Sequence, residues 1–186
     1  MKKYLVLALC LLILTVGHAQ NYTEYFANKT LRVDYIFTGD ASCQNVCLDE
    51  LSVLPSWAGR HQHLAELPLQ GNGQIIMKDL ESGKTVYTTS FSSLFQEWLE
   101  TDEAKVVSKG FENTFLLPYP LRPVEIEITL LSPRKEVRTC LKHTVRPDDV
   151  LIHQKGTAHI TPHKYLLKSG ETDKCIDVAI LAEGYT

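Results

Sequence analysis

The stretch from Val124 to Leu130 alternates between apolar and polar side chains without a fault. Its apolar positions are Val124, Ile126, Ile128 and Leu130, with glutamate or threonine between them. Successive side chains of a strand point to opposite faces of a sheet, so a two-residue period places all four apolar side chains on one face. The stretch therefore predicts a β-strand with one buried and one polar face, and any fold for the chain has to cover that buried face.

Other segments carry the same period or the turn signals that accompany it. Residues 31–38 alternate in the same way, and the run from Val46 to Leu54 slips in phase at Asp49-Glu50, which predicts a β-bulge or turn. Ser82-Gly83 separates two further runs and is typical of a hairpin turn. The strands expected from these patterns are 31–38, 46–54, 74–80, 85–91, 111–117, 124–130 and 137–145.

The last expected strand returns after the turn at Ser132-Pro133. Val137, Leu141 and Val145 would continue the buried face, and Cys140 would share the outer face with Arg138 and Lys142. Seven short strands joined by hairpins predict a mainly β fold, an antiparallel β-sandwich.

One short helix interrupts these strands. Ser93 and Gln96 have the spacing of a capping box, in which the first side chain caps the helix and the second reaches back to it. The apolar residues Leu94, Phe95, Trp98 and Leu99 follow a helical stripe that predicts burial in the core.

The N-terminus has the parts of a secretory signal peptide. Two lysines precede an apolar run from Tyr4 to Val16, and Gly17 and Ala19 are the small residues that a signal peptidase reads. The run is too short to span a membrane, which takes about 20 residues. Cys10 raises the alternative of a lipoprotein, but Leu9 stands where a small residue is expected. Residues 1–19 are thus predicted to be a cleaved signal peptide of an exported protein, with no transmembrane segment after cleavage.

Composition changes again near the C-terminus. Residues 148–174 contain Gly156, Pro162 and Gly170 with only short apolar clusters, which is typical of an extended connector. Residues 175–186 begin with an almost unbroken apolar run, like a strand buried on both faces. The sequence therefore predicts a sandwich over residues 20–147, a connector over 148–174, and over 175–186 a single strand whose covering neighbours the sandwich does not supply.

Four cysteines lie beyond the signal peptide: Cys43, Cys47, Cys140 and Cys175. An exported protein can form disulfides, and four cysteines allow three full pairings, none of which the sequence selects. The Cys43 and Cys47 spacing is not followed by a second matching pair, which argues against a structural zinc site. We expect ordinary thiols or a disulfide without catalytic meaning.

The motifs of common enzymes do not occur in these residues. The sequence has no H-E-x-x-H, no G-x-S-x-G elbow, no Walker loop and no dinucleotide fingerprint. Its net charge is −3 and no basic stripe is present, so nucleic acid is not an expected partner. His61 and His63 with Glu66 form one weak candidate for a metal site, and His159 with His163 a second that Pro162 opposes by breaking any helix. We expect these histidines to serve packing or solvent contact, and we expect no metal or cofactor in this chain.

The long segment from Pro55 to Gly73 is the candidate contact surface. It carries Trp57 and Arg60, residue types that are frequent where protein surfaces bind strongly, together with His61 and His63. Trp57 could instead close one end of the sandwich, and the sequence leaves both interpretations open.

Several long blocks resemble a known family, in order along the chain. They are "LRVDYIFTGD", "LDELSVLPSWAGRHQHLAELPLQGNGQI", "TSFSSLFQEWLETDEAKVVSKGFENTFLLPYP" and "KGTAHITPHKYLLKSG" with "CIDVAILAEGYT". They are similar to the N-terminal region of bacterial IgA-peptidase-family zinc metallopeptidases, from about Tyr25 to Thr186.

The resemblance implies an exported protein in which a β-sandwich precedes an α/β zinc-peptidase domain. It also implies that Ile176 to Thr186 is the first strand of that domain, and that the zinc ligands lie in an H-E-x-x-H helix further on. No residue here matches that motif, so the chain is expected to be a non-catalytic accessory domain that packs on the catalytic domain or engages substrate. The alternative is a free-standing exported module that binds a glycan or a host protein near Trp57 and Arg60.

Overall fold

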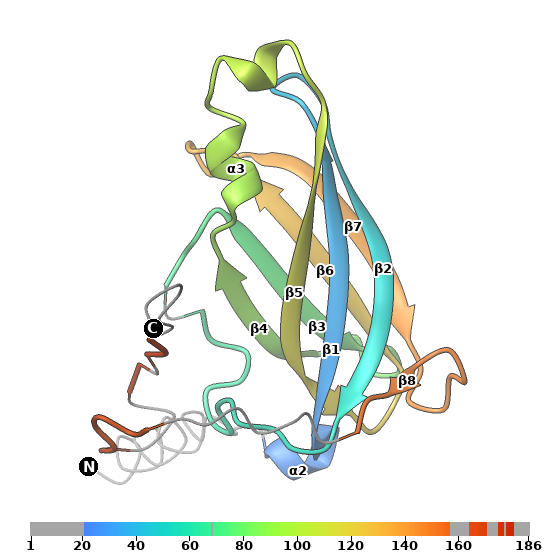
Figure 1. Ribbon diagram of the computed structural model, residues 1–186. Coiled ribbons are helices and arrows are strands. Elements are labelled where there is room, and N and C mark those ends of the chain that lie inside the picture. The colour runs from blue at the N-terminus through green and yellow to red at the C-terminus, as the bar shows by residue number, and fades with distance from the viewer. Residues whose placement is uncertain (1–20, 68, 157–163, 171–174, 177, 181–186) are drawn as a thin grey trace, which may run out of the picture.

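The computed structural model describes residues 21–67, 69–156, 164–170, 175, 176 and 178–180. Two sheets pack face to face, with α2 at one end and α3 at the other (Figure 1). The elements are α2 (Tyr22–Tyr25), β1 (Phe26–Gly39), β2 (Gln44–Leu54), β3 (Gly73–Asp79), β4 (Thr85–Phe91), α3 (Leu94–Trp98), the 3-10 helix η1 (Glu103–Lys105), β5 (Lys109–Pro120), β6 (Val124–Leu131), β7 (Val137–Val145) and β8 (His153–Gln154). The predicted β-sandwich is confirmed.

The strand order is β5-β1-β2-β8 in one sheet and β4-β3-β6-β7 in the other. Every neighbouring pair is antiparallel except β2 and β8, which run parallel over two residues of each strand. The first sheet therefore gains β8 at its edge, an eighth strand among the described residues where the sequence predicted seven.

The alternating positions predicted to face inward form the core. Ile126, Ile128 and Leu130 are completely buried, and Val124 is nearly so. The opposite sheet contributes the inward set of β1, which is also completely buried: Leu31, Val33, Tyr35 and Phe37. Apolar side chains from both sheets thus fill one core, as the two-residue period predicted.

Four register shifts break the regular pairing, and two of them bear on predictions from the sequence. Glu50 pairs with Asp34 and Leu48 with Tyr35, so Asp49 is the extra residue, at the predicted phase slip. On β7, Thr139 pairs with Leu130 and Val137 with Leu131, which leaves Arg138 unpaired. The expectation that Val137 faces the core is wrong, because this bulge turns it outward and leaves it 66% exposed.

Helix α3 begins as the capping box predicted. Ser93 Oγ accepts a hydrogen bond from the Gln96 backbone N–H, and the two side chains bond at 3.0 Å. Phe95 and Leu99 are buried, but Leu94 is 73% exposed, so its predicted burial is wrong. A helix of five residues presents only one narrow face to the core. That face includes Gln96, whose Nε2 donates to the carbonyls of Asn72 and Leu131 and joins α3 to the sheet below it.

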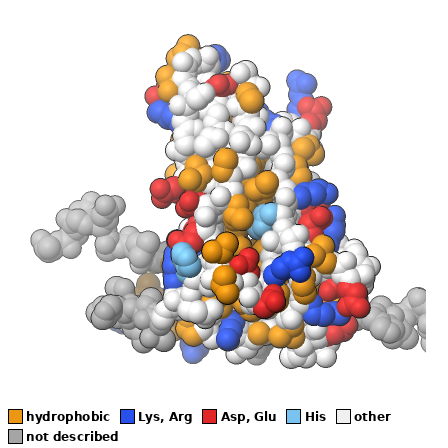
Figure 2. Space-filling model, turned by 90° about the vertical axis from the view of Figure 1, so that its right-hand side faces the viewer, with side chains coloured by type: hydrophobic (Ala, Val, Ile, Leu, Met, Phe, Trp, Pro, Cys, Tyr) orange, Lys and Arg blue, Asp and Glu red, His pale blue; other side chains and the backbone are white. Residues whose placement is uncertain are grey.

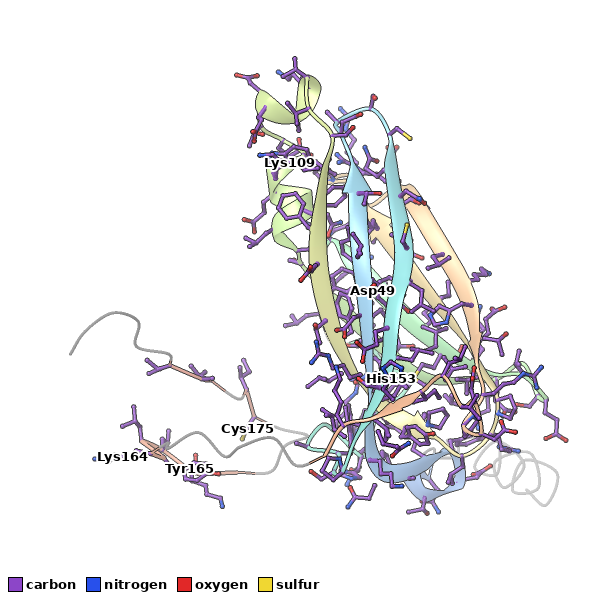
Figure 3. The ribbon with its side chains drawn as sticks, turned by 45° about the vertical axis from the view of Figure 1, so that its right-hand side comes forward. Asp49, Lys109, His153, Lys164, Tyr165 and Cys175 are labelled. Carbon is purple, nitrogen blue, oxygen red and sulfur yellow. The ribbon has the colours of Figure 1, made fainter. Side chains whose placement is uncertain are left out.

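The connector is pinned to the sandwich at its start. Ile152 is buried in the core, and β8 follows it with Ser52 opposite His153. The Lys155 backbone N–H donates to the carbonyl of Val53, and the Lys155 ammonium lies 3.0 Å from a Glu50 oxygen. His153 lies beside the same strand (Figure 3), with Nδ1 3.3 Å from Glu50. Residues 148–155 therefore belong structurally to the sandwich.

The closing apolar run forms no strand in its described residues. Ile176, Val178 and Ile180 are exposed, and Cys175 is drawn apart from the sheets (Figure 3). A strand needs a neighbour to bond its backbone groups, and the described part of the chain offers this segment none. The prediction that it belongs to a following domain stays a prediction.

Candidate functional site

The long loop between β2 and β3 folds around Trp57. The indole is only 9% exposed, and its Nε1 donates a 3.1 Å hydrogen bond to the carbonyl of Arg60. The ring meets Tyr87 edge to face at 6.1 Å. Gly59 lies so close beneath it that an added Cβ would stand 2.2 Å from a ring carbon, so only glycine fits there. The structure thus places Trp57 in the core, and its indole is not open to a ligand.

Arg60 ties this loop to the second sheet. Its Nη2 donates to the carbonyls of Leu64 at 3.1 Å, of Glu66 at 3.0 Å, and of Thr88 on β4. The guanidinium also lies 5.2 Å from the centre of the Tyr87 ring, within the range of a cation–π interaction. Both strong-binding residue types of the predicted contact surface are therefore occupied by the fold itself.

The histidines of the same loop lie on its surface. His61 packs on Tyr22, with ring centres 4.3 Å apart, and His63 Nδ1 lies 2.8 Å from a Glu66 oxygen. Within the described ranges, no three His, Cys, Asp or Glu side chains are grouped so as to hold a metal ion. His159 and His163 lie outside the described residues. A contact surface at this loop stays a prediction, which now rests on His61 and His63.

One polar pair inside the sandwich was not predicted. Tyr35 on β1 and His143 on β7 bridge the two sheets, with the phenol oxygen 2.6 Å from His143 Nε2. Burial lowers the pKa of His143, and burial raises the pKa of the Tyr35 phenol, so both are neutral near pH 7. His143 Nδ1 is buried with no hydrogen-bond partner among the described residues. One signal in the sequence could have found it, since His143 shares the inward phase of Leu141 and Val145.

We expect this histidine to make folding stability depend on pH. Protonation would place a charge on a buried imidazole, and this loss of solvation outweighs the favourable interaction of the charged ring with the Thr144 backbone. Because the folded-state pKa lies below the unfolded value near 6.5, the unfolded state binds the extra proton first. The free energy of unfolding should therefore be fully retained above about pH 6.5 and fall as the pH drops below that value, as urea titrations from pH 8 to pH 5 would measure.

The matched variant for this prediction is His143→Gln, which keeps a hydrogen-bonding group beside Tyr35 and cannot titrate. Its unfolding free energy should be nearly flat from pH 8 to pH 5. Carboxylates titrate in a lower pH range. Burial opposes ionisation of Asp34, but its hydrogen bonds and paired arginine lower its pKa. Such a group loses its contribution to folding stability only below the pKa of the unfolded state, near 4. Equal slopes for wild type and variant above pH 5 would contradict the assignment to His143.

A shallow cavity opens at the end of the sandwich where the connector starts. Its volume is about 480 Å³, and it is lined by Asp79, Leu80, Glu81, Arg122, Pro123 and Arg146. These residues come from three neighbouring loops, 79–84, 121–123 and 146–152. We call the surface of these loops the connector end. The Leu80 backbone N–H donates to the Pro123 carbonyl, which holds two of the loops together.

Charged groups on one wall of this cavity are fixed. Arg122 Nε lies 3.5 Å from Asp79, and the guanidinium stands 5.2 Å from the centre of the Tyr25 ring. Asp79 is nearly fully buried and accepts hydrogen bonds from Ser82 N and Oγ; these bonds and Arg122 lower its pKa despite the opposing effect of burial. Arg146 also lines the cavity and makes no ion pair with any residue that the structure describes.

The cysteines form no cluster. Cys43, Cys47, Cys140 and Cys175 are free and exposed, so the structure selects none of the three possible pairings. Among the described residues, no helix has the length and hydrophobicity needed to cross a bilayer.

Comparison with known families matches residues 21–142 to the Peptidase M64 N-terminus. The matched stretch starts at the cap of α2 and ends within β7, so it covers nearly all of both sheets. No curated protein matches the chain. The predicted resemblance is confirmed, and the chain belongs to the Peptidase M64 N-terminus family, the N-terminal region of IgA-peptidase-family metallopeptidases.

Proposed function

We propose that this chain is the non-catalytic accessory domain of an exported zinc metallopeptidase and packs on the catalytic domain. The observation that carries the proposal is the coincidence of the family match with the sandwich, because residues 21–142 include all of its strands except the end of β7 and β8. The zinc and the general base would then belong to the catalytic domain, in agreement with a sequence that contains no H-E-x-x-H.

The way the chain leaves the sandwich supports this role. Ile152, β8 and the Lys155 bond to Val53 hold the start of the connector against β2. A partner that follows the connector is tethered to one end of a rigid body, and tethering raises its effective concentration there. Such an arrangement suits a domain that positions a neighbour or presents substrate to it.

Binding in trans tests the proposal. The chain would be titrated, by isothermal calorimetry, into the purified catalytic domain of an M64 metallopeptidase whose folding is checked by circular dichroism. We expect a saturable complex, and we expect no peptidase activity from the chain alone on a casein substrate. If no complex forms at 100 µM of each protein, the packing role is wrong.

Export is a separate part of the proposal. We expect a chain expressed with residues 1–19 to be recovered outside the cytoplasm with Gln20 as its first residue. The same chain without residues 1–19 should stay in the cytoplasm. Recovery of an uncleaved first segment would show that these residues are not a cleaved signal peptide.

The alternative, a free-standing module that binds glycan or host protein, has less support. It was placed at Trp57 and Arg60, and the structure uses both for internal packing and hydrogen bonds.

A further inference from the structure

We infer that the connector end is the surface on which the metallopeptidase domain docks, an inference that rests on the proposed packing role. The connector end combines exposed apolar side chains, a cavity and an arginine without an ion-pair partner. It also lies where the chain leaves the sandwich.

The apolar part of the surface comes from all three loops. Leu121 is 50% exposed and Val150 is 92% exposed. Leu80 and Leu151 are exposed as well. Figure 2 shows hydrophobic side chains among charged ones over the whole height of the visible face, the lower half with β8 included. Leu80 lines the cavity, and the other three lie on the loops that form it. Exposed apolar side chains with charged groups between them are typical of a protein contact surface.

The charged part of the surface indicates what the partner presents. Arg122 is already engaged by Asp79 and by Glu81, whose oxygen lies 3.5 Å from Arg122 Nη1. Arg146 faces the same cavity with no ion pair among the described residues. An apolar patch of the partner with an acidic side chain would fill the cavity and pair with Arg146 in the forked geometry that guanidinium groups favour.

The position of the connector selects this end over the other. The α3 end also exposes apolar side chains, among them Leu94 and Val106. The chain, however, leaves the sandwich beside β8, because Lys155 is bound to Val53 and Glu50. The α3 end lies roughly 30 Å or more from this point, at the far end of the long strands. A domain tethered here therefore meets the connector end at a much higher effective concentration than the α3 end.

The experiment compares two double variants in the calorimetric titration against the M64 catalytic domain. Leu121→Asp with Val150→Asp alters the connector end, and Leu94→Asp with Val106→Asp is the matched control at the α3 end. All four side chains are largely exposed, so both variants should keep the circular dichroism spectrum and melting temperature of the wild type. We expect the first pair to raise the Kd at least tenfold, and the control pair to change it less than twofold. Arg146→Glu alone should raise it about fivefold.

The outcomes separate the two claims. If the wild-type chain does not bind, the packing role fails and the docking surface with it. If the chain binds and the control pair weakens binding as much as the connector-end pair does, the packing role stands and the docking surface is wrong. If sedimentation shows that the connector-end pair disrupts a dimer of the chain instead, the occupant is a second copy and the inference is overturned.

Discussion

Replacement of Ile126 by alanine should lower the free energy of unfolding by about 2–5 kcal/mol, the usual range for a buried large-to-small change. Ile126 is completely buried and lies on a central strand, opposite Met77 of β3 on one side and His143 of β7 on the other. Strands on both sides and the second sheet above limit how far the neighbours can close on the space left behind. Urea unfolding followed by tryptophan fluorescence would measure the loss as a lower midpoint with an unchanged slope.

The control is Val137→Ala, which removes apolar atoms from the same sheet at a 66% exposed position. It should change the unfolding free energy by less than about 0.5 kcal/mol, as most exposed substitutions do. This pair also tests the bulge at Arg138, because the sequence pattern alone places Val137 inside. A loss below about 1 kcal/mol for Ile126→Ala, or a larger loss for Val137→Ala, would show that the inward face has been assigned wrongly.

The sequence predicted the sandwich because burial on one face of a strand leaves a period in the chain. The slip at Asp49 was visible in the same way, since a charged pair interrupts the apolar phase there. The bulge at Arg138 was not visible, because an apolar residue happens to continue the pattern at Val137. A sequence pattern shows which residues are apolar. It cannot show a bulge when the apolar and polar residues keep alternating through the extra residue.

Features that depend on distant partners could not be predicted. β8 has two residues and exists only because the edge of β2 accepts it, so no period marks it. The inter-sheet pair of Tyr35 and His143 joins residues far apart in the chain. Residue type and the length of the loop point to Trp57 and Arg60, but their roles depend on Tyr87 and Thr88, which lie on β4.

Arg60→Ala should lower the free energy of unfolding by about 2–4 kcal/mol, which makes Arg60 a structural residue. Its Nη2 donates to the carbonyls of Leu64, Glu66 and Thr88, with two hydrogens shared among the three, and a charged donor contributes more to a bond than a neutral one. Arg60 Nε is buried without a hydrogen-bond partner, and its desolvation lowers the stability that the side chain contributes. We therefore expect a smaller loss than the sum of three charged hydrogen bonds. Arg60→Lys should recover less than half of the loss, because an ammonium group cannot lie flat on Tyr87 while it reaches three carbonyls.

Arg138→Ala is the matched control, because it removes an arginine whose Nη2 pairs with Glu100 at 2.8 Å near the surface. A partly exposed ion pair contributes little, so its loss should stay below about 1 kcal/mol. The same urea titrations measure all three variants, and a glycan and protein binding array measures wild type and Arg60→Ala in parallel. If Arg60→Ala unfolds at the wild-type midpoint but loses a ligand on the array, Arg60 is a contact residue. The free-standing binding module would then be the better account of the chain, because a side chain that is dispensable to the fold and required by a ligand belongs to a binding site.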